Sequence, residues 1–242
     1  MERTDRNSQI AHQELLLKAK TGRIDLYFLG DSITRRWGCT DPQWSELYAN
    51  WKANFYGWNA ANFGWGGDRV EHMLWRVTHG ELEGVGPKVI VVSAGTNNIG
   101  RTTGRPDRAE HIVDGVRTLI AACLERAPEA RVIVTAIFPR NDAVQDAGLG
   151  TWAEISAINK RLAELADQEK IWFLNVNDQL ADADGSLRDG LTVDKLHLSA
   201  QGCQVWADGL KPLLTEFLGP PAEVDLAPPP TGDPSLRKDG AK

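Results

Sequence analysis

The apolar run over residues 88–94 is the feature that most constrains how this chain folds. Four β-branched residues follow one another without a polar residue between them, at Val89, Ile90, Val91 and Val92. An uninterrupted run of this kind is typical of a parallel strand whose two faces are both covered by helices. Further strands are predicted over residues 24–29, 59–63, 131–137 and 171–176.

Helical segments separate the predicted strands. Helices are predicted over residues 8–20, from Ser32 through Arg36, and over 42–51, 68–79, 107–127, 151–168 and 199–217, with Asp68 as the N-cap of the fourth. Strands that alternate with helices imply right-handed crossovers. The sequence therefore predicts an α/β fold with a central parallel sheet of about five strands and helices on both faces.

The chain length of 242 residues fits one domain with its own buried core. We expect an N-terminal helix within residues 1–23 that packs on a domain spanning residues 24–218. The composition changes after Gly219, because six of the twelve prolines and no aromatic residue lie beyond it. Residues 219–242 are therefore predicted to be a disordered or loosely draped tail.

Charge and composition exclude several classes of protein. The net charge of -6 argues against a nucleic-acid surface, which would be basic. No stretch approaches the roughly 20 apolar residues of a membrane span, and the first residues lack the apolar core of a signal peptide. We expect a cytoplasmic protein, or a periplasmic or secreted one if a signal peptide has been removed. The three cysteines lack metal-site spacing.

Three predicted strands end on turns of small or polar residues. These turns contain Ser32, residues 64–68 and residues 95–98. Because the carboxyl ends of parallel strands share one edge of a sheet, the turns should converge there. Ser32 can act as a nucleophile, while a backbone N–H at 66–67 and the Asn97 amide can stabilise an oxyanion. Ordinary helix capping and tight turns are the alternative interpretation of each block.

A nucleophilic serine needs a general base, and His197 is the favoured candidate. It lies in an irregular segment after the last strand, whereas the other four histidines lie on predicted helices. Asp194 precedes it by three residues, so that its carboxylate can reach the imidazole Nδ1 within one turn. The alternative is a solvated pair that caps the final helix. The GxSxG elbow of α/β-hydrolases is absent, as are the HExxH and P-loop patterns.

Four blocks in this order resemble those of the SGNH, or GDSL, hydrolase family. They are residues 30–34, 62–68, 95–98 and 194–197. Residues 74–83 and 87–92 are further similar to the branch that contains the catalytic subunits of intracellular platelet-activating-factor acetylhydrolase. Bacterial members of this branch are often acetyl-xylan or other carbohydrate esterases. The resemblance implies a flavodoxin-like three-layer αβα sandwich with no metal and no cofactor, and it is compatible with a homodimer.

The resemblance also implies the roles of individual residues. It makes Ser32 the nucleophile, His197 the base and Asp194 the acid that orients it. It assigns the oxyanion donors to the Ser32 N–H, the Gly67 N–H and the Asn97 side chain. We further expect three neighbouring residues to contact substrate, namely Asp31, Trp65 and Asn98.

These residues predict a serine esterase that removes short acyl groups, most of all acetyl, from an oxygen ester of a small molecule or oligosaccharide. Tryptophans at seven-residue steps from Trp37 to Trp65 either pack under loops or line a cleft. Exposed indoles would favour a sugar as the alcohol of the substrate. The alternatives are a short-acyl phospholipid, a thioester or a lysophospholipid, and, in another class, a carbohydrate-binding protein without catalysis.

Overall fold

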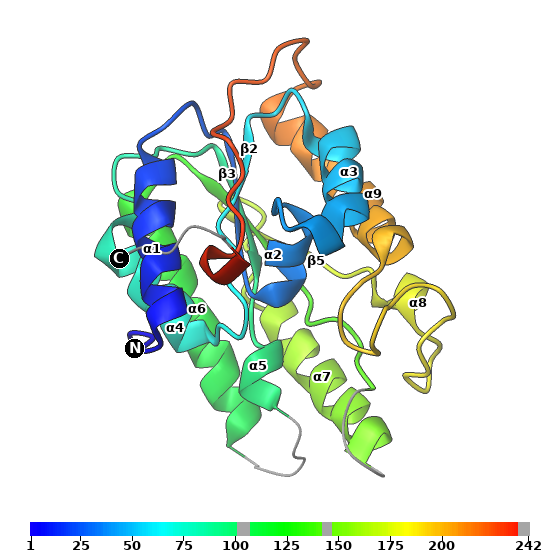
Figure 1. Ribbon diagram of the computed structural model, residues 1–242. Helices are drawn as coiled ribbons and strands as arrows, with labels where there is room; N and C mark the ends of the chain where they lie inside the picture. Colours follow the sequence, from blue (N-terminus) through cyan, green and yellow to red (C-terminus); the bar gives the residue numbers. More distant parts are fainter. Residues whose placement is uncertain (101–106, 142–146, 237–242) are drawn as a thin grey trace.

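A five-stranded, all-parallel sheet lies at the centre of the protein in a computed structural model that describes residues 1–100, 107–141 and 147–236 (Figure 1). The strand order is β2-β1-β3-β4-β5, and every paired strand is parallel. The strands are β1 Leu26–Gly30, β2 Ala60–Asn62, β3 Val89–Ser93, β4 Arg131–Thr135 and β5 Ile171–Leu174. All five predicted strands are therefore confirmed, each shorter than expected by one or two residues.

Helices cover both faces of the sheet, which confirms the predicted three-layer αβα sandwich. One layer contains α1 (Arg6–Ala19), α4 (Val70–Arg76), α6 (Arg108–Arg126) and α7 (Ala147–Ala163). The other contains α2 (Ser32–Trp37), α3 (Ser45–Phe55), α8 (Asn177–Leu180) and α9 (Ala200–Leu218). The short helix α5 (Thr96–Ile99) follows β3. The described residues contain no helix long and apolar enough to cross a lipid bilayer.

Alternate side chains of each central strand enter different halves of the core. In β3, Ile90 and Val92 pack toward α1, α4 and α6, whereas Val89 and Val91 pack toward α3 and α9. All four are fully buried. Burial on both faces explains why this strand is an uninterrupted apolar run in the sequence.

The helix after residue 68 differs from the prediction. Arg69 is its N-cap, and the Asp68 carboxylate is fully buried, where it pairs with Arg76. The α-helical part ends at Arg76, and a π-helical turn, η2 (Val77–Glu81), completes the segment. Asp68 does not cap this helix, because its carboxylate binds the buried Arg76 guanidinium, eight residues later in the chain.

The evenly spaced tryptophans mainly build the core. Trp37 and Trp51 pack against Phe28, with ring centroids 6.1 and 4.7 Å away, and both are buried. Trp58 and Trp65 are also buried. Packing under helices and loops is thus the correct interpretation for these four, and the structure does not place them as exposed stacking platforms.

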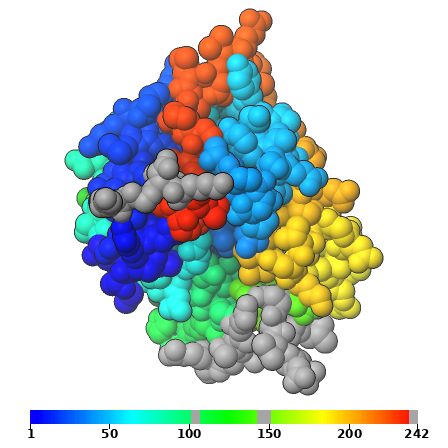
Figure 2. Space-filling view, viewed as in Figure 1, coloured from blue at the N-terminus to red at the C-terminus, as the bar shows by residue number. Residues whose placement is uncertain are grey.

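The segment after α9 returns along the molecular surface between α1 and α3 (Figure 2). The Arg23 N–H donates to the Leu226 carbonyl at 2.8 Å, and the Leu226 N–H donates to Asn59 Oδ1 at 2.7 Å. Further along, the Asp233 N–H donates to Asp41 Oδ1 at 2.6 Å. Over residues 219–236, where we expected a disordered or draped tail, the chain is held by specific hydrogen bonds. The last predicted tail residues, 237–242, lie outside the described part.

Candidate active site

Ser32 lies at the carboxyl edge of the sheet, as the first residue of α2 directly after β1. Asp31 is the N-cap of this short helix, and its carboxylate accepts the Ile33 N–H at 2.9 Å. The hydroxyl of Ser32 is therefore presented at a helix N-terminus, half-buried, 2.8 Å from Nε2 of His197. The capping interpretation holds for Asp31, while the Ser32 side chain is left to contact the histidine.

The loop that carries His197 is folded tightly on itself. Thr192 and Leu198 form an antiparallel bridge across it, and Lys195 at its tip has a left-handed φ of 63°. Asp194 Oδ1 accepts the His197 backbone N–H at 2.8 Å, and Asp194 Oδ2 lies 2.7 Å from His197 Nδ1. The N-cap of α9 is Ser199, so neither Asp194 nor His197 caps that helix.

The charge on Asp194 is maintained despite partial burial. Burial on its own would raise the pKa of this carboxyl, but hydrogen bonds from the His197 backbone and ring, and from the Leu196 N–H, lower the pKa on balance. An ionised carboxylate beside Nδ1 favours the imidazole tautomer that carries its proton there. Nε2 of His197 is then the nitrogen that can accept the Ser32 proton.

The turn over residues 64–68 brings backbone amides close to Ser32. A Cβ on Gly64 would lie 2.6 Å from the Arg35 nitrogen, so that only glycine allows the turn to approach α2 this closely. Gly67 has a φ of +76°, which also favours glycine. A Cβ on Gly66 would lie 4.0 Å from the Ser32 Cβ, which places this turn beside the serine side chain.

Asn97 belongs to α5, at the end of β3, and contacts the same turn. Its Nδ2 donates one hydrogen bond to the Asp68 carbonyl at 2.8 Å. A side-chain amide carries two N–H groups, so a second one can be offered to a ligand. The turn after β2 and the residues after β3 are therefore joined at one edge of the sheet, as the sequence predicted.

All three residues expected to contact substrate have partners within the protein, and their contact with substrate stays a prediction. Asn98 Oδ1 accepts the Val70 N–H at 3.0 Å, and its Nδ2 donates to Glu71, so this side chain holds the start of α4. Trp65 is buried and donates from Nε1 to Ser8 Oγ at 2.7 Å. The Asp31 carboxylate is buried at the start of α2, where burial is the main cause that raises its pKa to about 7.

A chain of buried ionic groups lies behind the turn. Arg76 binds the carboxylates of Asp68 and Glu81 and donates to the Phe63 carbonyl, and Glu81 also contacts His12 Nδ1 at 2.7 Å. Sequence reasoning did not identify this cluster, nor the contact between Arg36 and Asp194. The signal that was available is Arg76 itself, a cation within an otherwise largely apolar helical stretch.

A serine, a histidine and an aspartate linked in this order, beside a glycine-rich turn, are typical of hydrolases that use a serine nucleophile. The chain belongs to the GDSL-like lipase/acylhydrolase family, whose model matches residues 28–205. The family and the site together indicate an ester hydrolase.

A curated relative shares the family, and solved structures share the fold. The chain is 30% identical to platelet-activating factor acetylhydrolase IB subunit alpha1 of Bos taurus over 228 residues, which are 92% of this chain and 89% of that protein. A GDSL-like lipase from Bacteroides thetaiotaomicron has a similar structure, with a TM-score of 0.65 and 19% identity over 86% of this chain and 97% of that one. An acetyl-xylooligosaccharide esterase variant from Geobacillus has a TM-score of 0.56 and 19% identity, covering 79% of this chain and 93% of its own.

Proposed function

We propose that the protein is a serine esterase that removes short acyl groups, in particular acetyl, from oxygen esters. The observation that carries this proposal is the continuous hydrogen-bond relay from Ser32 Oγ through His197 to Asp194, at 2.8 and 2.7 Å. Both distances suit proton transfer within a hydrogen bond.

In this mechanism, Ser32 Oγ attacks the ester carbonyl while His197 Nε2 takes its proton. The resulting oxyanion accepts hydrogen bonds from the backbone N–H groups of Ser32 and Gly67 and from Asn97 Nδ2. His197 then gives the proton to the leaving alcohol, and an acyl-enzyme remains on Ser32. Water, deprotonated by the same imidazole, attacks the acyl-enzyme and releases the acid.

The acyl group and the alcohol have different support. The acetyl group is supported by the acetylhydrolase relative at 30% identity. The prediction that the alcohol part of the ester is a sugar depended on exposed tryptophans. That argument is weakened because Trp37, Trp51, Trp58 and Trp65 are buried. The alcohol therefore has to be decided by experiment between an acetylated sugar and an acetylated phospholipid.

The experiment measures acetate release from acetylated xylo-oligosaccharides and from platelet-activating factor in parallel, with Ser32→Ala as the blank. We expect the wild-type protein to release acetate from one of the two substrates well above the Ser32→Ala blank. Release from the sugar supports a carbohydrate esterase, and release from the lipid supports a phospholipid acetylhydrolase.

A generic aryl acetate completes the comparison. If the wild-type protein leaves all three substrates intact, the esterase proposal is wrong. Binding of xylo-oligosaccharide without any turnover would then favour a carbohydrate-binding protein that retains the fold. Loss of the aryl acetate activity in Ser32→Ala ties the activity to the relay and excludes a contaminating esterase.

A further inference from the structure

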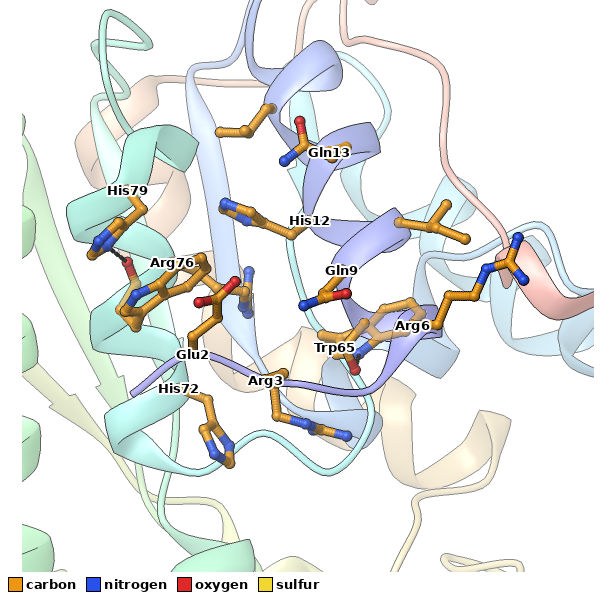
Figure 3. Close-up of a pocket in the computed structure, with 14 residues that line it drawn as sticks. Glu2, Arg3, Arg6, Gln9, His12, Gln13, Trp65, His72, Arg76 and His79 are labelled. Carbon is orange, nitrogen blue, oxygen red and sulfur yellow. Dashed lines mark hydrogen bonds between the residues drawn. The ribbon is translucent and has the colours of Figure 1, made fainter. Parts of the chain in front are cut away.

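A cavity of about 510 Å³ lies between α1 and the α4–η2 segment, and Arg3 reaches from its wall to the turn beside Ser32. Figure 3 shows Arg3 on the N-terminal segment that crosses the lower end of this cavity, below His12 and beside Trp65. The segment precedes α1 and belongs to no strand of the sheet. Its contact with the turn therefore joins the first residues of the chain to the candidate active site.

Arg3 contacts the turn at two points. Its Nη1 donates to the Gly66 carbonyl at 3.1 Å and lies 3.4 Å from Asp68 Oδ1. Asp5 holds the other side of the guanidinium, with its Oδ2 3.0 Å from Arg3 Nη2. The side chain is 27% exposed, so these contacts are partly shielded from water. Arg3 is thus positioned by one carboxylate while it binds the backbone of the turn.

The contacted carbonyl belongs to the peptide unit that supplies the Gly67 N–H. The carbonyl oxygen and the N–H of a trans peptide point in opposite directions within one rigid plane. A hydrogen bond that fixes the Gly66 oxygen therefore also fixes the direction of the Gly67 N–H. Because hydrogen bonds in series polarise one another, a cationic donor on the carbonyl also makes that N–H a stronger donor.

The flanking parts of the turn have other supports. Arg76 donates to the Phe63 carbonyl at 3.0 Å and to Asp68 Oδ2 at 2.8 Å, and Asn97 donates to the Asp68 carbonyl. These bonds hold the two ends of the turn. Glycines at 66 and 67 give the peptide between them unusual rotational freedom, so an added constraint on this peptide has a specific effect.

We propose that Arg3 is a positioning residue for the oxyanion site: it orients and polarises the 66–67 peptide so that the Gly67 N–H is aimed at the oxyanion. This inference rests on the proposed esterase function, in which Gly67 supplies one of three donors. Arg3 acts through the peptide and need not touch the substrate itself.

The test compares Arg3→Met and Arg3→Lys with a matched control, Arg6→Met. Arg6 lines the same cavity and is exposed, and its side chain makes no hydrogen bond or ion pair within the described residues. We expect Arg3→Met to lower kcat and kcat/KM together by about tenfold to a hundredfold, less than the full loss of an oxyanion donor. Arg3→Lys keeps a cationic donor group at this position and should recover part of this loss. Arg6→Met should retain wild-type kinetics.

A second measurement does not depend on turnover. The ¹H and ¹⁵N amide resonances of Gly67 should shift or broaden in Arg3→Met and stay unchanged in Arg6→Met. Thermal melting of each variant shows that it is folded, and Arg3→Ala, which also lacks the donor, serves if Arg3→Met is not. An unchanged Gly67 resonance in the folded Arg3 variant overturns the proposal, as does a kcat equal to that of Arg6→Met. If the wild-type protein hydrolyses no ester, the esterase function fails, and the resonance still decides whether Arg3 orients the peptide.

Discussion

The Arg36 guanidinium lies 3.4 Å from Asp194 Oδ2, the same carboxylate oxygen that contacts His197 Nδ1 at 2.7 Å. It also lies over the ring of Trp44, whose centroid is 4.4 Å away. Arg36 follows Ser32 by one turn of α2, so a single helix presents both the serine and a cation to the loop of His197. The aromatic ring holds the guanidinium against the carboxylate that orients the base.

Replacing Arg36 by methionine should have a modest effect on catalysis. Asp194 is 46% exposed, and ion pairs in such surroundings contribute about 0.2–1 kcal/mol. We therefore expect kcat/KM for an aryl acetate to fall by about twofold to fivefold. Added salt should reduce the difference between the wild-type protein and Arg36→Met, because it screens the pair. A hundredfold fall would contradict this modest role and make Arg36 essential to the hydrogen-bond relay from Ser32 to Asp194.

Neighbouring asparagines allow a test of the oxyanion site. Asn97→Ala should raise the barrier by roughly 3 kcal/mol, as expected for an oxyanion donor, and should lower stability by about 0.5–1.5 kcal/mol through the lost bond to the Asp68 carbonyl. Asn98→Ala should lower stability and leave the kinetics nearly unchanged, because Asn98 accepts the Val70 N–H at the start of α4. Loss of such a cap costs about 0.5–2 kcal/mol of stability. Kinetics and melting of both variants check the assignment, and equal kinetic losses in the two would sink it.

Local patterns were enough to predict the sheet and the order of its strands along the chain. Four of the strands are built on apolar runs, β2 is a short alanine-containing segment, and the serine, the glycine turn and Asn97 follow β1, β2 and β3. His197 and Asp194 are only three residues apart, so their contact is local as well. Features of this kind depend on spacing along the chain, which the sequence displays directly.

Contacts between distant residues could not be predicted in this way. Arg36 and Asp194 are 158 positions apart, and Arg3 and Gly66 are 63 apart. Asp68 looked like a helix cap, but a buried partner outcompeted the nearby backbone amides for its carboxylate. The tryptophan spacing likewise carried no information about exposure, because burial of each ring is decided by the helices that pack over it.

Removal of Arg76 should strongly destabilise the fold. Its guanidinium is buried with the carboxylates of Asp68 and Glu81, both fully buried, so methionine would leave two charges without their principal partner. Breaking a buried pair from one side costs about 3–5 kcal/mol. Urea unfolding should show this loss for Arg76→Met and almost none for Arg69→Met, whose side chain is 56% exposed. A loss below about 1 kcal/mol would mean that the cluster relaxes or takes up protons.

Asp31 should make the protein less stable as the pH rises from about 4 to 7. Burial, with the charge of Asp68 as a further cause, raises the pKa of this carboxyl from 3.8 to about 7. Between these two values the folded state binds the proton that the unfolded state has lost, so stability falls with pH through this window and levels off above it.

Asp31→Asn keeps an acceptor for the Ile33 N–H and removes the titration. The free energy of unfolding of the wild-type protein minus that of Asp31→Asn should therefore decrease from pH 4 to 7.5. Asp178→Asn, at an exposed position in α8, controls for the general charge change. A difference that stays constant with pH, or grows, would show that Asp31 is ionised in the folded protein throughout.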